Sequence, residues 1–262
     1  MPDVKELLAE RSDLSTFLVH FTRVQDDGTT GRDVLLKILH DQTLKATRAH
    51  GMAKSRLDEM GRSLPDGQSV PREVADRLSV VCMSEAPMQH WSMLCADIPG
   101  RSCKFSPYGL VFSKTWALRH SFNPVWYLNT TPGQTWLTTP VNELAELATE
   151  GRACAKTADG GWEKIRFRDS QIARLLPFIE TAGVGKDFSW EREWRRVGSV
   201  AFLIRQIVAV LAPETDHAAF QAAYERQCEQ WESGAESLNL VDPTWSPTRI
   251  ESAVERHDPS SD

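Results

Sequence analysis

Short β-rich runs are interleaved with helical segments at irregular distances, and this pattern limits the possible folds most. The runs "LSTFLVHFT" (14–22), "LSVVCMSEAP" (78–87) and "YGLVFSK" (108–114) are rich in β-branched and aromatic residues and are typical of strands. The helical stretches between them do not recur with a regular β-α-β spacing. The sequence therefore predicts an α+β fold, in which flanking helices cover a split or strongly bent mixed sheet.

The chain of 262 residues is long enough for one sizeable core. We expect a single α+β domain over residues 1–212, followed by a C-terminal helical segment and polar tail over 213–262. Helical patterns are expected at 4–11, 31–47, 139–153 and 214–233, and in 167–183 with an interruption near Pro177; a long β region is expected at 197–211.

Charge and cysteine usage exclude several functional classes. The net charge is −6 and the sequence pI is about 5.7, so no global basic field would recruit nucleic acid, although a local basic groove stays possible. The five cysteines are scattered without a C-x-x-C pair, which favours a reducing compartment over a disulfide framework. No apolar run is long enough to span a membrane, and the expected location is the cytoplasm.

The stretch "FSWEREWRRVGSV" (188–200) has two interpretations. A helix would place Glu191 and Arg195 at i,i+4, a mildly stabilising pair. The residues that follow are valine, phenylalanine and isoleucine, which favour a loop that enters a strand. On the second interpretation Glu191 and Glu193 point to one side, either as a surface ion-pair ladder or as an anionic site.

Four stretches in order, "FLVHFTR", "LSVVCMSEAP", "YGLVFSKTWALRHSFNPVWYL" and "WEREWRR", resemble the AbiGi family of abortive-infection (phage-resistance) proteins. The resemblance covers most of residues 15–210. The order of an early H-x-T, an aromatic central segment and a late E-x-E also resembles ADP-ribosyltransferases, including DarT-like toxins. This second, more remote resemblance implies an ADP-ribosyltransferase-like core that binds NAD as a substrate.

The transferase resemblance implies roles for three residues at the end of the first β-rich run. His20 would bind the adenosine ribose of NAD, with Thr22 beside it, and Arg23 would contact the pyrophosphate, since a guanidinium matches phosphate oxygens. A histidine between Val19 and Phe21 on a buried strand is equally typical of a satisfied core residue.

The same resemblance assigns the later residues. Glu193 would be the catalytic carboxylate, which stabilises the oxocarbenium-like state formed as the nicotinamide–ribose bond breaks, and Glu191 would orient the acceptor. Tyr108 would be the aromatic platform for nicotinamide, with Phe105 or Trp116 as alternatives. A packing role for Tyr108 is the competing interpretation.

Two functional classes follow. One is an NAD-dependent enzyme that modifies a nucleic acid or a protein during phage infection. The other is a non-catalytic antitoxin or regulator that acts on a neighbouring toxin. No metal is implied, because the spacings of Cys82, His90, Cys95 and Cys103 match no compact metal site.

Overall fold

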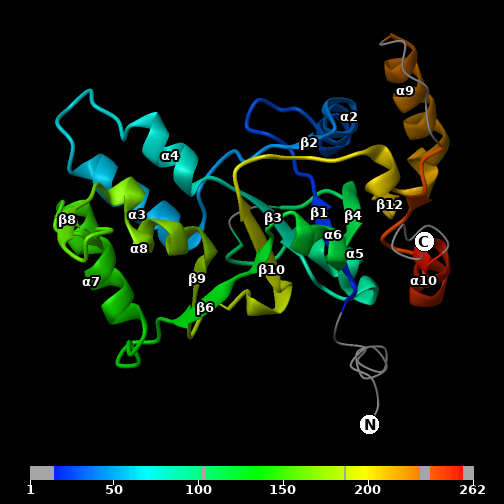
Figure 1. Ribbon diagram of the computed structural model, residues 1–262. Helices are drawn as coiled ribbons and strands as arrows, with labels where there is room; N and C mark the ends of the chain where they lie inside the picture. Colours follow the sequence, from blue (N-terminus) through cyan, green and yellow to red (C-terminus); the bar gives the residue numbers. More distant parts are fainter. Residues whose placement is uncertain (1–14, 102–103, 186, 231–236, 256–262) are drawn as a thin grey trace.

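A seven-stranded sheet forms the centre of the molecule (Figure 1). The computed structural model describes residues 15–101, 104–185, 187–230 and 237–255. The strand order is β13-β12-β4-β1-β3-β10-β5, and all neighbours are antiparallel except β12 and β13. The strands are β1 (Phe17–Phe21), β3 (Val80–Ser84), β4 (Gly109–Ser113), β5 (Asn123–Pro124), β10 (Glu193–Val197), β12 (Ala209–Leu211) and β13 (Leu240–Val241).

Both faces of this sheet are covered, because the central strands are apolar on both sides. On β1, Leu18 packs into one core cluster with helix α2, whereas Val19 packs into a second cluster on the opposite face. Helices α2, α6 and α9 contribute to the first cluster, and α5 and α10 contribute to the second. These helices are α2 (Gly31–Asp41), α5 (Trp91–Leu94), α6 (Lys114–Arg119), α9 (His217–Gln230) and α10 (Pro247–Glu255).

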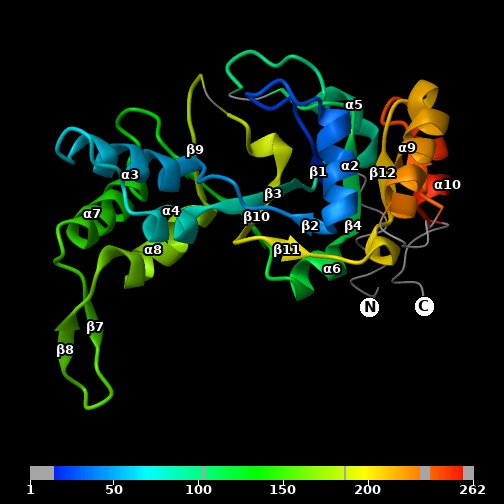
Figure 2. The same ribbon diagram turned by 90° about the horizontal axis from the view of Figure 1, so that it is seen from above.

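A side unit with its own core lies at the β10 end of the sheet (Figures 1 and 2). Its core joins Leu128, Phe167, Ile172 and Leu176, among others. A hairpin of β7 and β8 projects from this unit (Figure 2). The elements are α3 (Gly51–Arg62), α4 (Arg72–Leu78), β6 (Trp126–Asn129), α7 (Thr138–Thr149), β7 (Cys154–Lys156), β8 (Trp162–Lys164), α8 (Gln171–Leu175) and β9 (Ile179–Ala182), with β6 and β9 paired in parallel.

The predicted α+β class and mixed sheet are confirmed, and several boundaries are corrected. The helix expected over 31–47 ends at Asp41, because Gln42 adopts the left-handed conformation. The helix expected around Pro177 is only a short α8 and a 3-10 turn, after which β9 begins. The expected N-terminal helix and the end of the C-terminal tail lie outside the described residues. The C-terminal segment also adds a strand, β13, to the sheet edge.

The β region expected over 197–211 is broken into pieces. The strand β10 ends at Val197, a two-residue strand β11 (Val200–Ala201) pairs with β2 (Thr43–Leu44), and a 3-10 turn precedes β12. Gly198 has a φ of 75°, which turns the chain out of β10. Among the described helices, none has the length and apolar character needed to cross a membrane.

The sheet is locally split between β1 and β3. These two strands are joined by a single pair, Val19 with Ser84, whereas β1 and β4 are paired over five residues. On the Cys82 side of this pair the β1–β3 pairing does not continue, and Nδ1 of His20 lies 2.8 Å from the carbonyl oxygen of Cys82. This short pairing between β1 and β3 lies beside the site described next.

Candidate functional site

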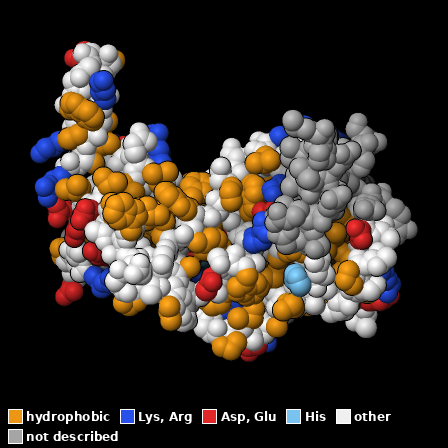
Figure 3. Space-filling model, turned by 90° about the horizontal axis from the view of Figure 1, so that it is seen from below, with side chains coloured by type: hydrophobic (Ala, Val, Ile, Leu, Met, Phe, Trp, Pro, Cys, Tyr) orange, Lys and Arg blue, Asp and Glu red, His pale blue; other side chains and the backbone are white. Residues whose placement is uncertain are grey.

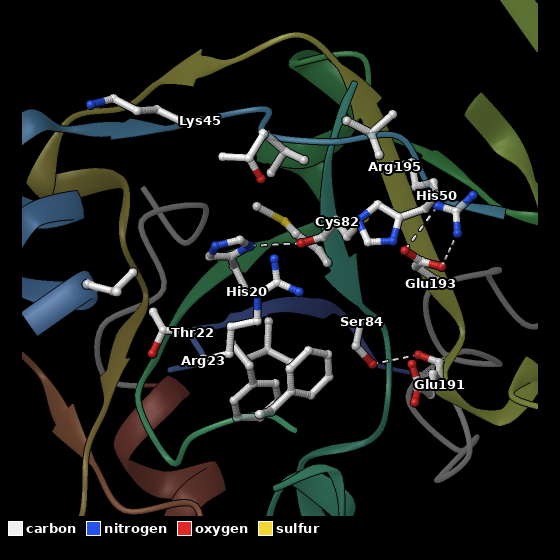
Figure 4. Close-up of a pocket in the computed structure, with 18 of the residues that line it drawn as sticks. His20, Thr22, Arg23, Lys45, His50, Cys82, Ser84, Glu191, Glu193 and Arg195 are labelled. Atoms are coloured by element: carbon white, nitrogen blue, oxygen red, sulfur yellow. Dashed lines mark hydrogen bonds and ion pairs between the residues drawn. The ribbon is translucent and has the colours of Figure 1, made fainter. Parts of the chain in front are cut away.

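A cleft of about 730 Å³ lies between the split in the sheet and the side unit (Figure 4). The strands β1, β3 and β10 supply one wall, and His50 with residues of β6 and β9 lines the side of the side unit. The loop 22–29, α2 and β2 line much of the rest. His20 and Glu193, which are far apart in the sequence, both line this cleft, as do Glu191 and Arg23. The expectation that the His20 and Glu193 strands border one cleft is confirmed.

Glu193 and Arg195 form a buried ion pair at the floor of the cleft. Arg195 Nε lies 3.0 Å from Glu193 Oε1, and Nη2 lies 2.7 Å from Oε2, so the contact is bidentate. The same guanidinium binds Glu180 at 2.7 Å and the carbonyl of Pro177 at 3.0 Å, and its side chain is 1% exposed. Burial acts to raise the pKa of Glu193, but the charge and hydrogen bonds of Arg195, together with Cys82 and His50, outweigh it and hold that pKa below its ordinary value.

Glu191 has the opposite electrostatic character. Burial raises its pKa, against the charge of Arg101 and with help from Glu193. Arg101 Nε lies 3.0 Å from Glu191 Oε1, but these two atoms do not meet hydrogen-bond geometry and both are buried without another hydrogen-bond partner. The cleft therefore holds one carboxyl whose pKa is lowered and one whose pKa is raised.

The backbone around Glu191 corrects the helix interpretation of 188–200. Only Ser189–Glu191 form a 3-10 turn, Arg192 is left-handed with a φ of 47°, and β10 begins at Glu193. The loop-into-strand prediction is confirmed. Arg195 pairs with Glu193 across one strand residue, and the i,i+4 pair with Glu191 does not form.

His20 fills the split between β1 and β3. Its Nδ1 lies 2.8 Å from the carbonyl oxygen of Cys82, and because a carbonyl only accepts, Nδ1 carries the proton. Burial lowers the pKa of His20, so the neutral ring presents Nε2 as an acceptor. Burial also raises the pKa of the Cys82 thiol, which favours its protonated form.

Two other predicted residues have different surroundings. Thr22 is 2% exposed, and its hydroxyl donates to the carbonyl of Gly31 at 2.8 Å, which ties the end of β1 to the start of α2. Arg23 lines the cleft and forms no side-chain ion pair with any residue that the structure describes. Arg23 is thus a cation available to an anionic ligand.

Tyr108 does not line the cleft. Its hydroxyl donates to Asp216 at 3.0 Å, and its ring stacks on Phe220 in the core. The packing interpretation fits this position, and the platform expected from the transferase resemblance is not at Tyr108. The alternative Trp116 is also a core residue, 7% exposed and stacked on Phe112.

Phe105, the other alternative, does line the cleft. Its ring already has two neighbours: Phe21 is stacked with a centroid distance of 5.6 Å, and the Arg101 guanidinium lies 3.9 Å from its centroid. Phe105 therefore acts first as a support for Arg101.

Sequence reasoning missed four cleft residues that shape the site: His50, Glu180, Tyr127 and Arg195. The Tyr127 hydroxyl accepts the backbone N–H of Glu193 at 3.2 Å. A signal existed for Arg195, because positions 193 and 195 share one face of a strand. The other three come from distant segments without a recognisable motif. Within the described part of the chain, no group of three or more His, Cys, Asp or Glu could hold a metal ion.

The buried histidines predict a loss of stability on mild acidification. Burial lowers the pKa of both His20 and His50 from the ordinary value of 6.5. Below pH 6.5 these histidines are protonated in the unfolded chain but resist protonation in the folded chain. The free energy of unfolding therefore decreases as the pH is lowered, by about 1.4 kcal/mol per pH unit for each histidine until its folded pKa is reached.

His20→Asn should flatten this dependence, since the amide keeps a donor near the Nδ1 position. Urea denaturation at pH 7.5 and 5.5 measures it. If the free energy of unfolding changed by the same amount between pH 7.5 and pH 5.5 in wild type and in His20→Asn, the assignment to His20 would be contradicted. The carboxyl of Glu193 acts in a separate window, because its lowered pKa costs stability only as the pH falls below its ordinary value of 4.5.

The comparisons with known proteins identify the family. The family model of the abortive phage resistance proteins AbiGi, described as antitoxin, matches residues 70–235. This region contains β3, β10 and the whole side unit except α3. No curated protein matches, and no solved structure matches, so the likeness to ADP-ribosyltransferases stays a prediction. The match covers more than half of the chain, which therefore belongs to the AbiGi family of abortive phage resistance proteins.

Proposed function

We propose that this protein is the antitoxin of a two-gene phage-defence system and neutralises its partner toxin by direct binding. The observation that carries the proposal is the family match over residues 70–235, whose description is that of an antitoxin. The matched region includes the cleft wall at β3 and β10 and most of the side unit. A partner protein encoded beside this chain is the implied target.

The geometry of the cleft agrees with a binding role. Both oxygens of Glu193 are engaged by the buried guanidinium of Arg195, so this carboxylate is already neutralised in the folded chain. The Cys82 thiol has a raised pKa, which disfavours a thiolate nucleophile. A buried ion pair such as Glu193–Arg195 can hold a binding surface in one conformation without taking part in a reaction.

Co-expression with the neighbouring gene tests the antitoxin function. We expect cells that express the neighbouring toxin alone to stop growing. Cells that also express this chain should form more colonies than these, by several orders of magnitude. An empty vector and a frameshifted copy of this chain are the controls. Equal killing with and without this chain would refute the proposal.

A second candidate is an NAD-dependent ADP-ribosyltransferase that modifies a nucleic acid or protein. The observation that favours it is the meeting of His20 and Glu193 in one cleft, with Arg23 at its wall. The neutral His20 offers an acceptor for a ribose hydroxyl, and Arg23 could hold a pyrophosphate. The aromatic platform fits less well, because Tyr108 and Trp116 lie in the core. Release of nicotinamide from NAD by the purified protein, with cell extract as the source of acceptor, tests this function.

A further inference from the structure

Helix α7 carries an apolar stripe that is largely exposed in the part of the chain that the structure describes. Apolar residues recur at spacings of three and four from just before the start of α7 into its third turn. Because successive residues of an α-helix are rotated by about 100°, this spacing places them on one side of the helix. We call this set the α7 stripe; it consists of Trp136, Leu137, Pro140, Leu144 and Leu147.

The α7 stripe is distinct from the side that packs the helix onto its own unit. The inward positions follow a second series and form part of the side-unit core or its border: Thr138, Val141, Ala145 and Ala148. By contrast, Trp136 is 89% exposed, Leu144 is 55% exposed and Leu137 is 43% exposed. A helix needs one apolar side to pack on its domain, so the second side is not explained by the fold of this chain.

The exposed tryptophans of the same region strengthen the point. Trp126 on β6 is 52% exposed and Trp162 on β8 is 72% exposed, in addition to Trp136. The view from below shows hydrophobic side chains gathered on the underside of the molecule, on the side where the hairpin of β7 and β8 projects (Figure 3). Tryptophan is enriched among the residues that dominate the binding energy of protein interfaces.

The flank of the α7 stripe defines the chemistry of its occupant. Glu143, Glu146 and Glu150 line a shallow hollow of about 250 Å³ together with Leu147 and Arg152. Arg152 Nη1 lies 3.0 Å from Glu150, which leaves two glutamates on the helix to meet an external cation. A lysine or arginine of a partner could lay its aliphatic stem on Leu147 and its charge on Glu143 and Glu146.

We infer that the α7 stripe is the surface with which this antitoxin binds its toxin, and that the bound segment of the toxin is basic and amphipathic. The inference rests on the proposed antitoxin function. Apolar side chains of the toxin would cover Trp136 and Leu144, and basic side chains would lie along the glutamate flank. The pairing of an apolar anchor with a charged rim supplies both affinity and specificity.

The test compares variants of the α7 stripe with matched controls in binding to the purified protein encoded beside this chain. We expect Trp136→Ser and Leu144→Ser each to raise the dissociation constant at least tenfold. Leu118→Ser is the control, because Leu118 lies on α6 and is exposed to a similar extent, 58%. Its dissociation constant should stay within twofold of wild type. Thermal melting should be unchanged in all three, because the side chains are exposed.

Charge reversal tests the partner chemistry. Glu143→Lys with Glu146→Lys should weaken binding at least tenfold and reduce its dependence on salt, whereas Glu163→Lys on the hairpin should have little effect. Stripe variants that bind like wild type would overturn the inference while the antitoxin function stands. So would a dimer of the free protein that Leu144→Ser dissociates, since a second copy would then be the occupant. Wild type that neither binds nor neutralises the toxin would refute the proposed function itself.

Discussion

Replacing Arg195 with methionine is expected to lower the free energy of unfolding by about 3 to 5 kcal/mol, the usual cost of removing one partner of a buried ion pair. The guanidinium is 1% exposed and binds both Glu193 and Glu180 at 2.7 Å. Without it, two carboxylates that are less than a fifth exposed face each other across the cleft floor. Urea denaturation at pH 7 measures the loss.

A double variant shows that the stranded charges cause this loss. Arg195→Met combined with Glu193→Gln removes one of the two carboxylates and should be more stable than Arg195→Met alone. Lowering the pH toward 4.5, the ordinary pKa of a glutamate, should also narrow the gap between Arg195→Met and wild type, because protonation removes the unpaired charge. A gap that stays constant with pH would point to lost packing of the arginine stem instead.

Local sequence patterns were sufficient for the strands that carry the site. The β-branched runs at 78–87 and 108–114 became β3 and β4, and the segment after Arg192 became β10. The turn that precedes β10 was recognisable from the absence of helix-favouring residues after 197. Its detail was not, because the left-handed conformation of Arg192 is fixed by tertiary bonds: the backbone N–H of Glu85 donates to the Arg192 carbonyl, and Ser84 Oγ donates to the Glu191 carbonyl.

Local sequence patterns did not predict the side unit. Its core depends on contacts between α3, α7 and α8, which come from three separate stretches of chain. His50 and Glu180 enter the cleft from this unit, at positions where no motif marks them. The choice between the two interpretations of Tyr108 was open for a similar reason. An aromatic residue before a strand has the same local pattern whether it faces a cleft or the core, and its bond to Asp216 joins residues more than a hundred positions apart.

Glu193→Gln is expected to separate the two candidate functions. If the cleft transfers ADP-ribose, removing the charge should slow NAD consumption by about 10²- to 10³-fold, since a preorganised electrostatic contact to the transition state is lost. The neutral amide also weakens the pair with Arg195, so a stability loss of about 1 to 3 kcal/mol accompanies the change. Loss of activity alone would therefore be ambiguous.

Glu180→Gln resolves the ambiguity, because Glu180 binds the same guanidinium at the same distance of 2.7 Å. Both variants weaken the hold on Arg195, with the smaller stability loss expected for Glu180→Gln because Glu180 makes one bond to the guanidinium and Glu193 makes two, and only Glu193→Gln should lose NAD turnover if Glu193 is catalytic. The antitoxin function predicts a different outcome: no NAD turnover by wild type, and neutralisation of the toxin by both variants at temperatures well below their melting points. Equal loss of turnover in both variants would assign the carboxylates to holding Arg195, and a Glu193→Gln variant with full NAD turnover would remove Glu193 from the chemistry altogether.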